Sequence, residues 1–127
     1  YNISRFLLRG SKGNTIGMII DFSKMEETVS PNFFGGEGEY RSRMTVDEMG
    51  KIVQGRLVPG ASIGLHTHET NCEVMYFLEG EATVLYDGEE LTLSAGQVHY
   101  CPKGHSHTIR NEGEVDVVFF AVLPNSP

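Results

Sequence analysis

The chain has 127 residues and carries 17 aspartates and glutamates against 10 lysines and arginines, which gives a formal net charge of −7 and a pI near 5.1. A chain of this length forms one domain with a sizeable core, and an acidic chain without any run of lysine and arginine is a poor ligand for phosphates, so we expect no nucleic-acid partner. The longest apolar run, residues 115–123, is too short to cross a bilayer and contains Asp116, so we expect no membrane partner either.

Residues 1–17 differ in character from the rest of the chain, because they contain only basic charges and three glycines. We predict that they form an N-terminal extension or, alternatively, an extra edge strand over residues 4–8. Residues 18–50 are predicted to contain a short helix, a loop and a strand. Ser23 and Glu26 have the spacing of a capping box at the start of that helix, and Ser30-Pro31 would end it.

The predicted loop, residues 32–39, is rich in glycine and holds Phe33 and Phe34. Two exposed phenylalanines in a loop are expected to pack against another surface. They either pack on the end of the protein's own barrel, or form a dimer contact or a lid over a cavity. The strand that follows, residues 40–46, places Arg41 and Arg43 on one face. These arginines either guard a solvated edge strand or hold a carboxylate substrate.

From residue 51 to residue 123, short strands alternate with turn signals, which is typical of an all-β barrel. Asp87-Gly88 is a favoured two-residue hairpin turn between two of these strands. The strands are expected at residues 52–58, 62–68, 73–78, 81–86, 89–93, 97–101, 105–110 and 115–122.

All histidines of the chain lie within this region, and three of them have the spacing of metal ligands. His66 and His68 are two residues apart, so both imidazoles point to the same face of a strand. Glu73 opens the next strand, and His107 lies on a later one. Three imidazoles and one carboxylate that converge from three strands suit a divalent transition metal.

Two segments resemble the two motifs of the cupin superfamily, G(X)5HXH(X)3-4E(X)6G over residues 60–80 and G(X)5PXG(X)2H(X)3N over residues 96–111. The resemblance to small single-domain cupins implies a jelly-roll barrel, also called a double-stranded β-helix. The barrel would hold one divalent transition metal per chain (Fe, Mn, Ni or Zn). It also implies a homodimer, formed by N-terminal strands that cross to the partner barrel.

The same resemblance implies a dioxygenase, decarboxylase or isomerase acting on a small anionic or polar metabolite. The alternative is a non-catalytic cupin that binds or senses a small carboxylate, and no catalytic residue can be assigned from the sequence. Alternation along the strands predicts that Ser62 and Gly64 share the face of His66. It also directs Met75, Phe77 and Ile109 into the barrel, and we expect the substrate pocket to be lined by these residues together with Arg56 and Arg43, whose charge would suit an anionic substrate.

His99 and His105 are predicted to be hydrogen-bonded residues of the core or rim, because the four-ligand set is complete without them. The strand over residues 97–101 could add an outer hydrogen-bond partner to the metal site from one of its two faces. Cys72 and Cys101 are too few for a disulfide framework. They are predicted to be free thiols in a cytoplasmic protein.

Overall fold

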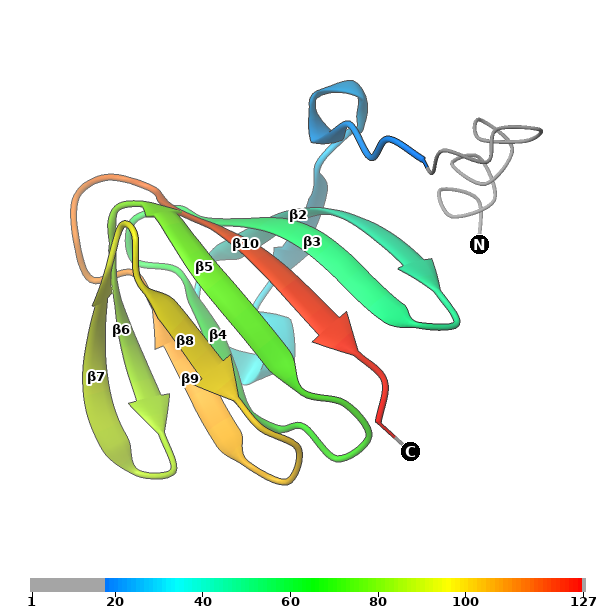
Figure 1. Cartoon of the computed structure of the whole chain (residues 1–127). Helices are drawn as coiled ribbons and strands as arrows, with labels where there is room; N and C mark the ends of the chain where they lie inside the picture. The colour runs from blue at the N-terminus through cyan, green and yellow to red at the C-terminus, as the bar shows by residue number, and fades with distance from the viewer. Residues whose placement is uncertain (1–17, 127) are drawn as a thin grey trace.

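The computed structural model describes residues 18–126, and the predictions for residues 1–17 lie outside them. Within the described residues the chain is almost entirely β-structure (Figure 1). Its ten strands are β1 (Thr28–Pro31), β2 (Glu39–Asp47), β3 (Gly50–Leu57), β4 (Ser62–Thr67), β5 (Glu73–Glu79), β6 (Glu81–Tyr86), β7 (Glu89–Ser94), β8 (Val98–Cys101), β9 (Ser106–Arg110) and β10 (Val117–Pro124). Two short 3₁₀ helices, η1 (Phe22–Lys24) and η2 (Phe33–Gly35), precede β2.

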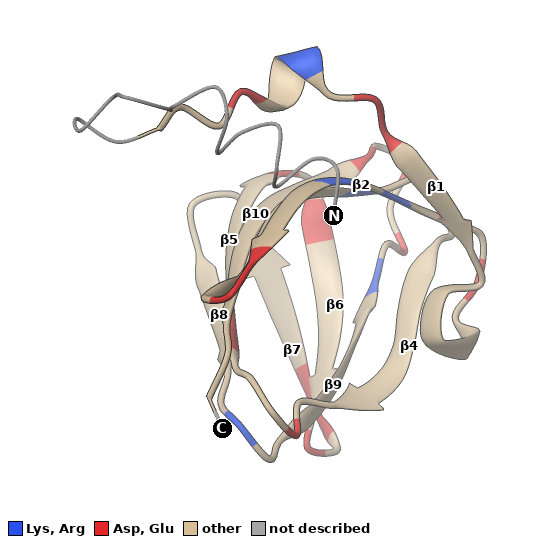
Figure 2. Ribbon diagram, turned by 90° about the vertical axis from the view of Figure 1, so that its right-hand side faces the viewer, with Lys and Arg blue, Asp and Glu red and all other residues tan. Residues whose placement is uncertain are grey.

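The strands of this region form two antiparallel sheets that face each other, as Figure 2 shows. The six-stranded sheet has the order β1-β2-β3-β10-β5-β8, and the four-stranded sheet has the order β4-β9-β6-β7. The late strand β10 therefore lies between β3 and β5, to both of which it is hydrogen-bonded. The prediction of an all-β jelly-roll barrel is confirmed.

The core lies between the two sheets and follows the alternation expected of strands with one buried face. In β5, Glu73, Met75 and Phe77 are buried while Val74, Tyr76 and Leu78 are exposed. Fully buried side chains from both sheets meet there, among them Leu57, Phe77, Val84, Ile109, Val117 and Phe119. Burial of such side chains is the main favourable contribution to folding.

The hairpin between β6 and β7 turns at Asp87 and Gly88, as predicted. Their φ angles are +47° and +84°, both in the left-handed region that a type I′ turn requires. The Asp87 carboxylate also accepts a hydrogen bond from the Ser106 amide, and this bond together with the contact to His105 lowers its pKa. The turn is therefore tied to the start of β9.

The N-terminal segment differs from its prediction. The helix η1 has only three residues and its N-cap is Asp21, whose Oδ1 accepts a hydrogen bond of 3.0 Å from the Ser23 amide. The prediction of Ser23 as the N-cap is therefore wrong, because the helix already begins at Phe22 and Asp21 caps its first amides. Strand β1 was not predicted, and it pairs with β2 at the edge of the six-stranded sheet.

No helix among the described residues is long and apolar enough to span a membrane.

Candidate metal centre

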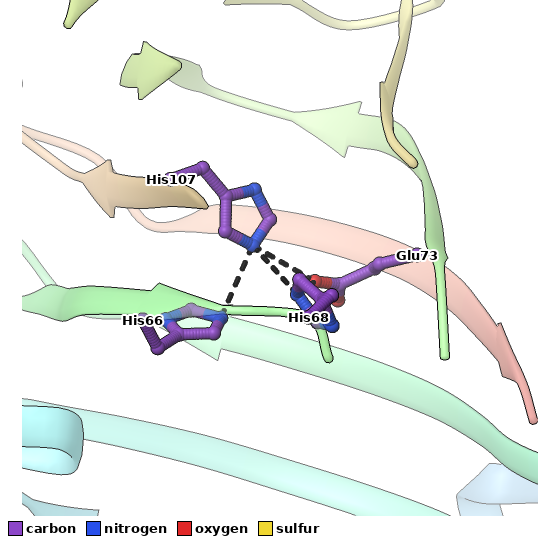
Figure 3. A group of neighbouring side chains, drawn as sticks. All are labelled: His66, His68, Glu73 and His107. Atoms are coloured by element: carbon purple, nitrogen blue, oxygen red, sulfur yellow. Dashed lines mark hydrogen bonds and ion pairs between the residues drawn. The ribbon is translucent and has the colours of Figure 1, made fainter. Parts of the chain in front are cut away.

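Four side chains converge on a single point in the interior (Figure 3). They are His66 on β4, His68 directly after the end of β4, Glu73 on β5 and His107 on β9. The Nε2 atom of His107 lies 3.0 Å from Nε2 of His68 and 3.1 Å from Nε2 of His66. The Oε1 atom of Glu73 lies 3.2 Å from both His68 Nε2 and His107 Nε2. All four potential ligand atoms lie within 4.8 Å of one another. The structure therefore brings together the four residues that the sequence nominated as ligands.

A bulge in β4 helps to aim the first of these side chains. Ile63 is paired with Ile109 and His66 with His107, so two residues of β4 lie opposite one residue of β9. Ile63 and His66 consequently line the same cavity although they are three residues apart.

The bulge overturns the prediction that Ser62 and Gly64 share the face of His66. The Ser62 hydroxyl instead accepts a hydrogen bond of 2.8 Å from the Glu37 amide. Gly64 lies against the η2 segment, where a Cβ atom would clash with the carbonyl oxygen of Phe34. A glycine inside a strand is a known sign of a bulge or a close backbone contact, and it was the signal available in the sequence.

Hydrogen bonds at the other ring nitrogens orient two of the imidazoles. His66 Nδ1 donates to the carbonyl oxygen of Gly64 at 2.8 Å, and His68 Nδ1 donates to Oδ1 of Asn71 at 2.7 Å. A carbonyl oxygen can only accept, so the proton of the neutral ring lies on Nδ1. Nε2 of each ring is then an unprotonated donor atom that faces the cluster, which is the form that binds metals.

This arrangement fits a divalent transition metal. Unprotonated nitrogens and an ionised carboxylate that face one another at 3.0–3.2 Å repel unless a cation lies between them. Neighbouring ligands of a six-coordinate ion with bonds of about 2.1–2.2 Å are separated by about 3 Å, which matches these distances. Four protein ligands would leave positions for an exogenous ligand on such an ion.

The electrostatic environment keeps the carboxylate ionised. Burial alone would raise the pKa of Glu73, but its contacts with the His107 and His68 imidazoles outweigh burial and lower the pKa to about 2. Burial lowers the pKa of His66. Burial also opposes protonation of His68, but its contacts with Glu73 and Asn71 prevail and raise its pKa. The cluster thus combines a fixed negative charge with imidazoles of unequal basicity.

A cavity of about 510 Å³ opens onto this cluster. One part of its wall is apolar or aromatic and is formed by Phe33, Phe34, Tyr40, Met44, Val53, Ile63, Ile109 and Leu123. The other part is polar and is formed by Lys51, Thr67, Glu69, Thr70 and Asn71. An apolar wall with a few convergent polar groups is typical of a small-molecule site.

The predicted pocket residues have different positions. Ile109 lines the cavity, as expected. Met75 and Phe77 point inward from β5, but they are fully buried and belong to the core beyond the cavity wall. The alternation along β5 is therefore correct, whereas the cavity lies nearer to Glu73 than to the end of that strand.

Arg43 and Arg56 do not reach the cavity, which corrects the prediction that they line it. Both lie on the outer face of the six-stranded sheet, where Arg56 donates to the Glu27 carboxylate at 2.9 Å and to Asp116 at 2.8 Å. Arg43 donates to the carbonyl oxygen of Met25 at 2.9 Å. The inner face of the same strands is taken by residues such as Tyr40. The arginines therefore anchor the N-terminal segment to the sheet.

The two phenylalanines of η2 cover different parts of the barrel. Phe33 packs against Tyr40, with ring centroids 5.0 Å apart. Phe34 stacks on His66 at the edge of the cavity and remains 57% exposed. Phe33 thus packs on the barrel end, and Phe34 covers the edge of the cavity.

Several lining residues were missed from the sequence, among them Lys51 and Asn71. Lys51 shares the inner face of β3 with Val53, so the alternation of that strand could have placed it. Asn71 lies in the polar corner between His68 and Glu73, where a side chain three residues after a histidine ligand can reach back to its ring.

Comparison with known proteins gives the same picture. Residues 53–123 match the family model described as a cupin domain. An oxalate-binding protein of Thermotoga maritima is 33% identical over 113 aligned residues, and the alignment covers 84% of this chain and 93% of that protein. A crystal structure described as a predicted oxalate decarboxylase of Thermotoga maritima has a TM-score of 0.80 at 31% identity and covers 85% of this chain and 99% of that one. The polyketide cyclase RemF of Streptomyces resistomycificus has the same fold, with a TM-score of 0.70 at 19% identity over 86% of this chain and 81% of its own.

Proposed function

Because this chain belongs to the cupin domain family, we propose that it binds one divalent transition metal through His66, His68, Glu73 and His107, and a small carboxylate such as oxalate on that metal. The observation that carries the proposal is the position of the four-residue cluster on the wall of a cavity that is large enough for a small molecule. A bound divalent ion supplies positive charge that carboxylate oxygens can approach. Fe, Mn, Ni and Zn all suit a site of nitrogen and oxygen ligands.

The comparisons favour a carboxylate as the small molecule. The Thermotoga maritima relatives are described as an oxalate-binding protein and as a predicted oxalate decarboxylase. Among the described residues of the cavity wall, Lys51 is the one lysine or arginine, and it lies on the polar part. An ammonium group on the cavity wall would attract a second carboxylate oxygen of the bound molecule. The apolar part of the wall would limit the access of water to the bound molecule.

A second candidate function is catalysis on the same ligand, as a decarboxylase, dioxygenase or isomerase. The observation in its favour is Glu69, a carboxyl group that lines the cavity outside the four-residue cluster. When a carboxylate loses carbon dioxide, the remaining carbon must take up a proton, and a carboxylic acid at the cavity wall can deliver it. Of the three reaction types, decarboxylation is the one that a relative's description names.

We also propose that the chain forms a homodimer. The outer faces of β5 and β8 expose an apolar patch made of Val74, Tyr76, Leu78, Val98 and Tyr100. A contiguous apolar patch on a sheet face is typical of an interface, and a second copy of the same face would cover it isologously.

One experiment tests the metal and carboxylate proposals together. The protein is purified anaerobically without chelators or a nickel column, its metal is measured by elemental analysis, and oxalate is titrated by calorimetry into the metal-loaded and metal-free forms. We expect about one metal ion per chain and heat of binding from the loaded form only. Formate released from oxalate would support the decarboxylase. Equal oxalate binding by both forms would contradict the proposed site.

A further inference from the structure

We propose that His99 is a positioning residue that holds the proton of His107 on Nδ1 and so presents Nε2 of His107 to the metal. His99 lies on the inner face of β8 and is only 4% exposed. Its Nε2 atom is 2.9 Å from Nδ1 of His107, whose side chain is fully buried. This role rests on the proposed function, because it assumes that His107 is a ligand.

The direction of this hydrogen bond follows from the rest of the cluster. Each of the two imidazoles can donate or accept, so one nitrogen of the pair must carry the proton. If the proton of His107 lay on Nε2, it would point at Nε2 of His66 and His68 and at Glu73, where the ligand atoms converge. With the proton on Nδ1, His107 donates to His99, and its Nε2 lone pair faces the cluster.

His99 therefore has the function for His107 that Gly64 and Asn71 have for the other two rings. His66 donates to the Gly64 carbonyl and His68 donates to the Asn71 side chain. Each imidazole of the cluster thus has one acceptor behind it, and outer partners of this kind hold ligand rings in place. His99 differs from the other two acceptors because an imidazole can also donate a hydrogen bond. Substitution of His99 can therefore change which nitrogen of His107 carries the proton, and this change can be measured.

The packing of His99 must be separated from its hydrogen bond. The ring of Tyr86 lies edge-on to His99, with centroids 5.5 Å apart, so removal of the imidazole also disturbs the core. Glutamine retains an acceptor oxygen on a side chain of similar reach, whereas leucine retains only apolar bulk. His105 offers a matched control because it is the other histidine outside the cluster and is bound to Asp87 at the surface.

The test compares His99→Gln, His99→Leu and the control His105→Gln with the wild type. The affinity for Zn²⁺ or Mn²⁺ is measured by competition with a chromogenic chelator, and folding is checked by thermal melting. The tautomer of His107 is read from ¹⁵N–¹H couplings of the imidazole in the metal-free protein. We expect the Nδ1–H form of His107 in the wild type and in His99→Gln. His99→Leu should bind the metal about 10–100-fold more weakly and contain both tautomers.

Several results would overturn the proposal. His107 protonated on Nε2 in the metal-free wild type would do so by itself, even if His99→Leu failed to fold. Equal losses in His99→Gln and His99→Leu would show that packing alone matters, and unchanged affinity in His99→Leu would show that the bond has no role. A wild type with the Nδ1–H tautomer that binds no metal would instead refute the proposed function and leave the hydrogen bond in place.

Discussion

The ring of Phe34 stacks on the imidazole of His66, with centroids 4.4 Å apart and planes inclined by 14°. Phe34 achieves this contact from a left-handed backbone conformation, with φ of +53°. Such a conformation costs an ordinary L-residue about 1–2 kcal/mol. The surrounding segment maintains it through close backbone contacts, in which Gly36 at the end of η2 lies against Ser62 and Gly64 of β4, and Gly64 lies against the Phe34 carbonyl. The strained residue is therefore held against a candidate ligand.

Replacement of Phe34 separates the stacking from the strain. Phe34→Ala should weaken metal binding about 2–10-fold, because an aromatic contact of about 0.5–1.5 kcal/mol that orients His66 is lost. Phe34→Gly should bind metal as weakly as Phe34→Ala but melt at a higher temperature, because glycine adopts φ of +53° without cost. Chelator competition and thermal melting measure the two effects. Full metal affinity in Phe34→Ala would show that the stacking does not orient His66.

Glu73 provides the single carboxylate of the cluster. Glu73→Gln removes a negative charge without a large change in volume, so metal affinity should fall by at least about 100-fold, the upper end of the effect of losing an outer partner. Elemental analysis after equilibrium dialysis measures the change. Glu81→Gln, at an exposed position on β6, is the matched control. Equal metal content in Glu73→Gln and the control would show that the metal is bound elsewhere.

Lys51 should contribute to the affinity for oxalate and not to that for metal. Lys51→Met keeps the aliphatic stem but removes the charge at the cavity wall, and oxalate should bind the metal-loaded protein about 3–10-fold more weakly, as expected for the loss of a partly exposed charge pair. Lys103→Met, in the exposed turn before β9, serves as the control. Calorimetry at low and high salt measures both variants. An identical affinity in Lys51→Met and the control would exclude contact between Lys51 and the ligand.

The Glu27 carboxylate joins the N-terminal segment to the arginines on the outer face of the sheet. Its hydrogen bonds with Arg56 lower its pKa from the ordinary value of 4.5. A lowered pKa means that the stabilisation is fully present above pH 4.5 and disappears as the pH falls through the folded-state value. Glu27→Gln should therefore cost about 1–3 kcal/mol at pH 7 and progressively less below pH 4.5. Urea unfolding of metal-free protein at several pH values measures this, and a cost independent of pH would contradict the role of the charge.

Lysine substitutions in the apolar patch on β5 and β8 should disrupt the proposed homodimer. Tyr76→Lys and Tyr100→Lys each place a cation in the exposed patch and should convert a dimer to a monomer at micromolar concentration, since an unpaired buried charge is costly. Light scattering or sedimentation measures the mass. Val115→Lys, at an exposed apolar position in the loop before β10, is the control. A wild type that is monomeric under the same conditions would disprove the homodimer.

Much of the fold was predictable because its signals are local. Alternation and turn residues located the strands from β3 to β10, and Asp87-Gly88 identified a hairpin through its need for positive φ angles. Strand β1 was not predicted, and the N-cap of η1 was predicted at Ser23 instead of Asp21. Strand β1 is short and depends on pairing with β2, and the cap of η1 depends on which of two neighbouring polar residues, Asp21 or Ser23, binds the first amides of the helix.

The candidate site was predictable to the extent that it depends on spacing along strands. His66, His68 and Glu73 lie close together in the sequence, and His107 belongs to the second motif. The alternation of β3 that places Lys51 and Val53 on its inner face also places Arg56 on the outer face, whereas the partner of Arg56, Glu27, is distant in the sequence and was not predictable. The bulge in β4 had a local signal in Gly64, but the contact of that glycine with η2 joins residues distant in the sequence and could not be predicted.

The central position of β10 in the six-stranded sheet constrains how the protein can be made. Strands β3 and β5 are both hydrogen-bonded to β10, so neither has its partner on that side until residue 124 has been synthesised. During translation the nascent chain exposes two open strand edges, and the sheet that carries Glu73 cannot close. Folding must therefore follow, not accompany, the synthesis of the barrel, and it depends on contacts of large sequence separation that form slowly.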